Sequence, residues 1–226
     1  TPITDHLVSP LLEYFNTRYP GITVSTQEMP QDAVETDVAE GALDMGISFS
    51  NVLSTEARSH EIETNILFTE TLNLAVGKTH PRAGQEDALS VQALEHESLI
   101  LLNSDFALRR HFDQYCREMA ITPHIVMETN SLSVIVEVVR LGRLATILPS
   151  TIASHRHGLY PVTLKPEMPR HTVTLICRKG GYKSPACLAF GVLAALWCNS
   201  RQEALFGDGI EALLPADLNG LPILPH

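Results

Sequence analysis

The chain has 226 residues, of which 44% are hydrophobic and 19% charged, and its formal net charge at pH 7 is −10. This composition is typical of a soluble globular protein with a sizeable core, and its acidic balance argues against direct binding to nucleic-acid phosphates. No apolar run reaches the roughly 18 residues of a membrane span, and the opening TPITDHL lacks a secretory signal, so we expect a cytoplasmic protein.

The first half of the chain alternates between helical and strand periodicities. A helix with one apolar face should end at Tyr19-Pro20-Gly21, and the β-branched alternation after it favours a strand. The predicted elements of this half are helix 5–19, strand 22–27, helix 30–41, strand 45–49, loop 50–61, and strands 66–68 and 72–76. Helices that alternate with strands in this way predict parallel sheets covered by helices.

The second half repeats this texture. Asn103-Ser104-Asp105 should cap one helix, and Asn130 and Ser131 should cap another that ends at Gly142. The predicted elements are helix 90–96, strand 98–102, helix 106–119, strand 125–127, helix 131–142, a strand to Pro149, helix 150–156, strands 160–164 and 173–177, and helix 185–199. Residues 201–226 have no sustained period and are predicted to be an irregular tail.

Two stretches share one strand–helix–strand layout, 28–50 and 128–150, and this repeat indicates two similar α/β lobes. Each lobe would direct a helix N-terminus at a small polar or anionic ligand. Strands near 69–76 and 171–177 would cross between the lobes. Lobe I would then comprise 1–69 plus 172–200, and lobe II would comprise 70–171.

The helix at 131–142 is apolar on two sides. Leu132, Ile135, Val136 and Val139 would pack on their own sheet, which leaves a second apolar face made of Val134, Val138 and Leu141. That face is covered either by another layer of the fold or by a partner subunit, and we favour a dimer. Glu137 and Arg140, which lie between the two faces, are spaced to form an ion pair.

Side chains that often carry chemistry form no convincing catalytic or metal-binding set. Cys116, Cys177, Cys187 and Cys198 are scattered and read as free thiols, and the pair His155 and His157 has no neighbouring carboxylates. The basic cluster Arg109-Arg110-His111 is predicted to be a solvated face. Without a nucleophile or phosphate-loop motif, we expect no enzyme, cofactor or metal site.

The residues Glu40-Gly41-Ala42-Leu43-Asp44-Met45-Gly46-Ile47 resemble a signature of the effector-binding domain of LysR-type transcriptional regulators. Tyr19-Pro20-Gly21-Ile22, His80-Pro81 and Gly142 with Leu148-Pro149 fall where that family has them, and the resemblance covers about 1–200. It implies an α/β fold of two Rossmann-like lobes of the periplasmic-binding-protein type II kind, joined by two crossover strands. Family members usually have a strand just before Thr1, so the resemblance also implies a gap in the lobe I sheet.

The resemblance further implies a small-molecule effector in the interlobe cleft, a homodimer or tetramer, and DNA binding only through an upstream winged helix-turn-helix. Residues 27–29, 99–109 and 128–131 are most similar to the cyanate-operon regulators of the family, which implies an anionic effector such as cyanate. Carried over by position, the effector site comprises Thr1, Thr4, Gln31, Asn103, Ser104, Phe106, Asn130, Ser131 and Thr146. The dimer interface comprises Val8, Leu12, Val134, Val138 and Leu141.

Two alternatives stay open at this point. Helix capping alone would account for the residue types at Ser104 and Asn130. The same fold would also serve a solute-binding protein of a transporter, which an exported precursor would favour. An enzyme on this fold is a third reading, but the sequence offers no nucleophile or base to support it.

Overall fold

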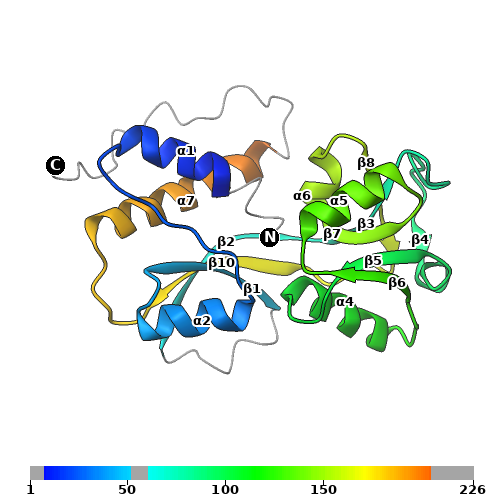
Figure 1. Cartoon of the computed structure of the whole chain (residues 1–226), viewed down its shortest axis with the longest axis horizontal. Helices are drawn as coiled ribbons and strands as arrows, with labels where there is room; N and C mark the ends of the chain where they lie inside the picture. The colour runs from blue at the N-terminus through cyan, green and yellow to red at the C-terminus, as the bar shows by residue number, and fades with distance from the viewer. Residues whose placement is uncertain (1–7, 52–60, 205–226) are drawn as a thin grey trace. The chain divides into compact units, whose positions relative to one another are not determined.

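The computed structural model describes residues 8–51 and 61–204, which form a mixed α/β fold (Figure 1). The described chain divides into two compact units: unit 1 is Glu70–His171, and unit 2 comprises the described residues on either side of that range. Among these residues, no helix combines the length and apolar character needed to cross a membrane. Thr1, Thr4, nearly all of the expected loop 50–61 and most of the expected tail lie outside the described residues.

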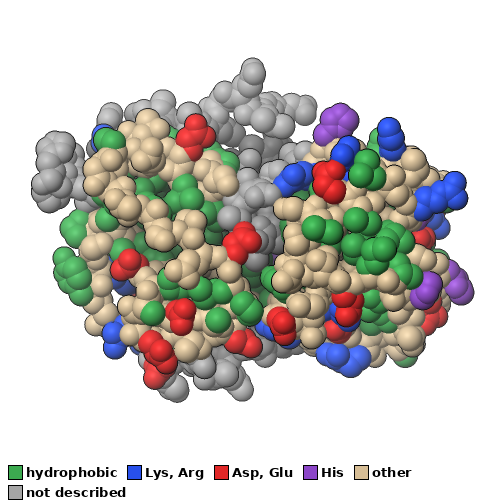
Figure 2. Space-filling view, in the orientation of Figure 1, with side chains coloured by type: hydrophobic (Ala, Val, Ile, Leu, Met, Phe, Trp, Pro, Cys, Tyr) green, Lys and Arg blue, Asp and Glu red, His purple; other side chains and the backbone are tan. Residues whose placement is uncertain are grey.

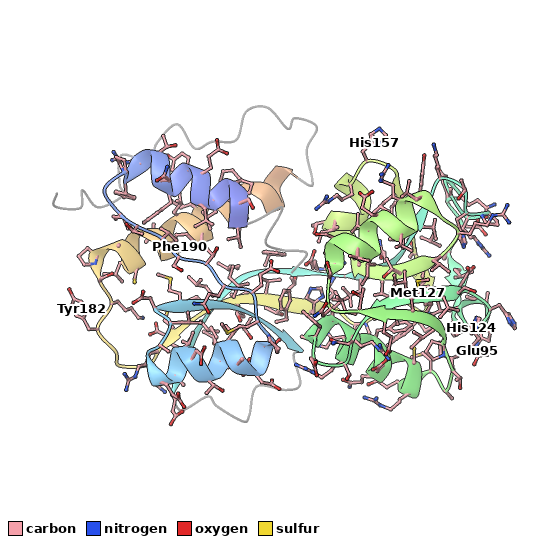
Figure 3. The ribbon with its side chains drawn as sticks, viewed as in Figure 1. Glu95, His124, Met127, His157, Tyr182 and Phe190 are labelled. Atoms are coloured by element: carbon pink, nitrogen blue, oxygen red, sulfur yellow. The ribbon has the colours of Figure 1, made fainter. Side chains whose placement is uncertain are left out.

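Unit 2 is built on a sheet with strand order β1-β10-β2. Its elements are α1 (Ser9–Arg18), α2 (Gln31–Glu40), β1 (Met45–Asn51), β2 (Ile62–Glu70), β10 (His171–Arg178) and α7 (Pro185–Ala204). α1 packs along α7 (Figure 1), and the ring centroids of Phe15 and Phe190 lie 5.4 Å apart; Phe190 is labelled in Figure 3. Leu11 and Leu193 complete the centre of this core.

In unit 2 one predicted strand is missing, and the last helix is longer than predicted. Residues 22–27 form no strand, although their alternation predicts one, and Val24 is 44% exposed. A strand pattern is stable only when the backbone pairs with a neighbour, and no neighbouring strand of the described chain pairs with this segment. The last helix continues to Ala204, so 201–204 are helical and do not belong to an irregular tail.

Unit 1 contains a five-stranded sheet of order β6-β5-β7-β3-β8. Its elements are β3 (Leu72–Gly77), β4 (Leu89–Ser90), α3 (Val91–Leu94), β5 (Ser98–Leu102), α4 (Ala107–Glu118), β6 (His124–Thr129), α5 (Leu132–Leu141), β7 (Ala145–Pro149), α6 (Ser150–His155), β8 (Leu159–Val162) and β9 (Leu164–Lys165). β5 runs parallel to β6 and β7, whereas β3 runs antiparallel to β7 and β8. The sheet is therefore mixed: the predicted parallel pairing is present between β5 and its two neighbours, and it is wrong for β3.

Helices cover both faces of this sheet. Phe112 and Tyr115 of α4 pack on one face with Leu74 and Leu99, while Ile135 and Val139 of α5 pack on the opposite face. α5 approaches β3 closely, because a Cβ built on Gly77 would lie 2.1 Å from the carbonyl oxygen of Val139. A residue without a side chain is required here for the helix to pack this closely against the strand.

The outer side of α5, which carries the second apolar face, is largely exposed in the single chain. Val134 is 49% exposed and Leu141 is 70% exposed, whereas Val138 packs partly against the unit's own core. Hydrophobic side chains gather on the part of unit 1 that carries α5 and β6 (Figure 2), and Met127 of the edge strand β6 is 52% exposed (Figure 3). The predicted pair of Glu137 and Arg140 is confirmed, with 2.6 Å between its charged atoms.

Candidate functional site

The site is organised by the edge of the unit 1 sheet where β5, β6 and β7 end. Parallel strands direct their carboxyl ends to one edge, and here the register pairs Leu102 with Thr129. The N–H of Asn103 donates to the carbonyl oxygen of Thr129 over 3.1 Å. Because α4, α5 and α6 each follow one of these strands, helices α4 and α5 begin next to each other at this edge.

Ser131 is the N-cap of α5. Its hydroxyl oxygen accepts from the N–H of Val134 over 3.5 Å, and its own N–H donates to Thr129 Oγ1 over 3.2 Å. Asn130 lies one residue earlier, is exposed, and does not serve as the N-cap. Capping therefore explains Ser131 but leaves the residue type at Asn130 unexplained.

The first turn of α4 differs from the prediction. Its N-cap is Phe106, and no side chain accepts a hydrogen bond from the first-turn N–H groups, so the expected capping by Asn103-Ser104-Asp105 is wrong. The side-chain oxygen of Asn103 is buried without a hydrogen-bond partner among the described residues. An uncapped helix N-terminus beside an unsatisfied amide is a place where a polar ligand can bind.

The other predicted ligand residues have different surroundings. Thr146 is 1% exposed and lies inside β7, three residues before the carboxyl end, so it stands behind the edge and not on it. Gln31 belongs to unit 2, where its amide donates to Glu35 over 2.8 Å and to the carbonyl oxygen of Phe49 over 2.7 Å. Both of its N–H donors are thus occupied by the protein. Of the predicted set, the structure groups Asn103, Ser104, Phe106, Asn130 and Ser131.

A buried polar cluster at the same edge is absent from the sequence prediction. The carboxylate of Glu70 accepts from the hydroxyl of Thr151 over 2.7 Å and lies 3.2 Å from Nε2 of His171. The ring of His111, on α4, lies 6.0 Å from that of His171 between centroids. Burial, together with the nearby charges of His171 and Arg110, lowers the pKa of His111 to about 4.

The basic cluster on α4 is not the solvated face that the sequence predicts. Arg109 donates to Asp113 over 2.8 Å, to the carbonyl oxygen of Leu102 over 2.9 Å, and to Glu128. Burial opposes the guanidinium charge, but the bonds to Asp113 and Glu128 outweigh it and raise the pKa of Arg109. Only the spacing of Arg109 and Asp113, four residues apart on one helix, could have indicated this network from the sequence.

The cysteines take no part in the site. All four are free thiols, as the sequence predicts, and Cys116, Cys177 and Cys198 are buried. Burial raises the pKa of Cys116 to about 12, so this thiol stays protonated and unreactive near neutral pH.

Comparison with known proteins gives the class that this fold and site define. The chain belongs to the LysR substrate binding domain family, whose model matches residues 1–195. It is 24% identical over 203 residues to the uncharacterized HTH-type transcriptional regulator YcgK of Bacillus subtilis, a match that covers 82% of this chain and 61% of that protein. It is also 25% identical over 149 residues to a probable nitrogen assimilation transcriptional activator of Synechococcus elongatus, covering 65% of this chain and 47% of that one. The chain thus spans about half to three fifths of the curated relatives it matches.

Solved structures share the fold. The effector binding domain of QuiR in complex with shikimate superposes with a TM-score of 0.69 at 22% identity, covering 88% of this chain and 93% of that one. The regulatory domain of CcmR from Synechocystis PCC6803, in complex with 2-PG, gives a TM-score of 0.73 at 17% identity, covering 85% and 91%. The expected fold, of the type II periplasmic-binding kind, is confirmed.

Proposed function

We propose that this chain is the effector-sensing domain of a LysR-type transcriptional regulator and that it binds a small anion at the carboxyl edge of the unit 1 sheet. The observation that carries the proposal is the side-chain oxygen of Asn103, which is buried without a hydrogen-bond partner among the described residues, in the loop that leads into the uncapped N-terminus of α4. Family membership supplies the class of function, and this edge supplies the chemistry.

The electrostatics of the edge favour negative charge. The N-terminus of a helix carries about half a positive elementary charge, and the N–H groups of its first turn have no partners within the helix. A half-turn of the planar Asn103 amide exchanges its oxygen for its NH₂ group, so this side chain can donate to an anion. Ser131 adds a hydroxyl beside the start of α5. These donors bind an anion without a buried countercharge.

The resemblance adds the finer parts of the proposal. Cyanate is the first candidate effector, because residues 128–131 are similar to the cyanate-operon regulators. The QuiR and CcmR domains were solved with shikimate and with 2-PG, which makes these two compounds further candidates. The whole protein would act in the cytoplasm as a dimer or tetramer and bind DNA through an upstream winged helix-turn-helix. An effector would change its DNA binding only by binding one arrangement of the subunits better than another.

A thermal-shift screen with cyanate, azide, shikimate and 2-PG tests the proposal. We expect at least one of these compounds to raise the melting temperature of the wild-type chain. Asn103→Ala and Ser131→Ala should remove that ligand-induced rise, whereas Ser133→Ala, at an exposed position on the same turn of α5, should keep it. The comparison uses the rise and not the melting temperature itself, because loss of the Ser131 cap alone costs about 1 kcal/mol. No rise with any compound in a folded wild-type chain would overturn the small-anion proposal.

A further inference from the structure

Two consecutive arginines on α4 hold the loop that joins β5 to α4. Arg109 donates to the carbonyl oxygen of Leu102 over 2.9 Å, at the start of this loop. Arg110 donates to the carbonyl oxygens of Asp105 over 2.8 Å and of Ser104 over 3.4 Å. The two guanidinium groups therefore hold both ends of the loop by hydrogen bonds.

The carbonyl groups of this loop are all occupied. Besides the three that accept from the arginines, the carbonyl oxygen of Asn103 accepts from the N–H of Phe106 over 3.3 Å. Across the residues that the structure describes, no acceptor is bound to the N–H groups of Ser104 and Asp105. A loop with every carbonyl engaged presents N–H groups to a ligand, and such an arrangement of backbone donors selects anions.

Arg109 also ties this loop to the neighbouring one. It bonds to Glu128, the penultimate residue of β6, which in the described part of the chain is an edge strand paired with β5. Glu128 is followed within three residues by Asn130 and Ser131. The side chain of Arg109 is 11% exposed and is further fixed by Asp113. Its charge is neutralised by these two carboxylates, so its role is to set geometry and not to bind the ligand.

We propose that Arg109 and Arg110 are positioning residues for the effector site. They orient the 102–105 loop so that its N–H groups face the ligand, and Arg109 fixes the spacing between that loop and the start of α5. This inference rests on the proposed function, since it concerns the same site.

The test compares Arg109→Gln and Arg110→Gln with Arg117→Gln, which removes an exposed arginine from the same helix. Amide signals of the ¹⁵N-labelled ligand-free chain are recorded first. We expect Arg110→Gln to shift signals of residues 103–107, and Arg109→Gln to shift these and also 129–132, while Arg117→Gln leaves both sets in place. Arg109→Lys should restore little, because an ammonium group cannot replace the three divergent bonds of a guanidinium.

Cyanate is then titrated into each variant, with 2-PG and shikimate as further probes. Arg109→Gln and Arg110→Gln should each weaken binding about tenfold, which is about 1.4 kcal/mol. Arg117→Gln should bind like the wild type. If Arg109→Gln and Arg110→Gln bind with wild-type affinity while Ser131→Ala binds more weakly, the positioning role is overturned and the proposed function stays intact. If the wild type binds none of the probes, the proposed function fails, and the ligand-free spectra still decide the positioning role: unmoved loop signals in both variants overturn it.

Discussion

The imidazole of His171 lies 3.2 Å from the carboxylate of Glu70, and these two residues are the last and the first of unit 1. The first and the last residue of unit 1 in the described chain therefore contact each other through buried side chains. Their side chains are 2% and 3% exposed, so water does not screen the interaction.

Removing the charge of Glu70 should therefore destabilise the protein. Glu70→Gln keeps the shape of the side chain but removes the carboxylate that accepts from Thr151 and lies beside the His171 imidazole. We expect a loss of about 1–3 kcal/mol in the free energy of unfolding, measured by urea denaturation. The matched control is Glu63→Gln, which removes an exposed carboxylate paired with Lys183 and should cost less than about 1 kcal/mol. Equal effects of the two substitutions would contradict this prediction.

His111 should make the protein sensitive to mild acid. Its pKa is about 4 in the folded chain and 6.5 ordinarily, so between these values the unfolded chain binds more protons. The free energy of unfolding must then fall as the pH is lowered from 6.5 towards 4. The full shift would be worth about 3 kcal/mol, and since the ring is half-buried, solvent screening should reduce this to about 1–2 kcal/mol.

The measurement is urea denaturation between pH 4 and pH 7.5. His111→Asn should lose this part of the slope, whereas His157→Asn, at an exposed position, should keep the wild-type slope. A wild-type slope in His111→Asn would show that other groups govern the acid sensitivity.

The outer face of α5 should be a subunit interface. Leu141→Glu places a carboxylate on a side chain that is 70% exposed in the single chain, so the chain's own fold should tolerate it. We expect at least a tenfold loss of self-association in analytical ultracentrifugation, because a buried, unpaired charge opposes an apolar interface. Leu141 is a better probe than Val138, which also packs against its own core.

Ser133→Glu adds the same charge to an exposed position on the same helix and serves as the control. An unchanged sedimentation coefficient for Leu141→Glu, with a folded chain, would rule out this face as the interface.

The close approach of β3 and α5 should not tolerate any side chain at Gly77. In Gly77→Ala the new methyl group would meet the Val139 carbonyl at 2.1 Å, so helix and strand must separate. We expect a loss of about 2–4 kcal/mol in the free energy of unfolding. Gly21→Ala, where no atom lies within 4 Å of the added group, should change it by less than about 1 kcal/mol. Similar stability of the two variants would show that the contact relaxes freely.

Local patterns in the sequence predicted the elements whose stability is local. Helix α5 follows from its apolar period, its Ser131 cap and its end at Gly142, and the structure has it at Leu132–Leu141. Residues 22–27 carry an equally clear strand pattern, yet they form no strand. A helix makes its hydrogen bonds within one segment, whereas a strand depends on a partner that its own sequence does not specify.

The same distinction between local and long-range contacts applies to the candidate site. Asn103, Ser104 and Ser131 could be nominated because the family resemblance carries the effector site over to their positions. The roles of Arg109 and His111 could not be found, because their partners Glu128 and His171 lie far along the chain. Long-range contacts tie a basic cluster that the sequence presents as solvated into the fold beside the candidate site.

The dimensions of α5 give its exposed face a further significance. Ten residues at 1.5 Å each make a stiff rod of about 15 Å. Ser131 caps one end, Leu141 protrudes at the other, and the backbone at Val139 rests directly on Gly77. Ile135 and Val136 are buried against the sheet as well as Val139, so the helix is held along its length. We therefore expect a displacement of the Asn130-Ser131 end to carry the exposed side chains of Val134 and Leu141 with it.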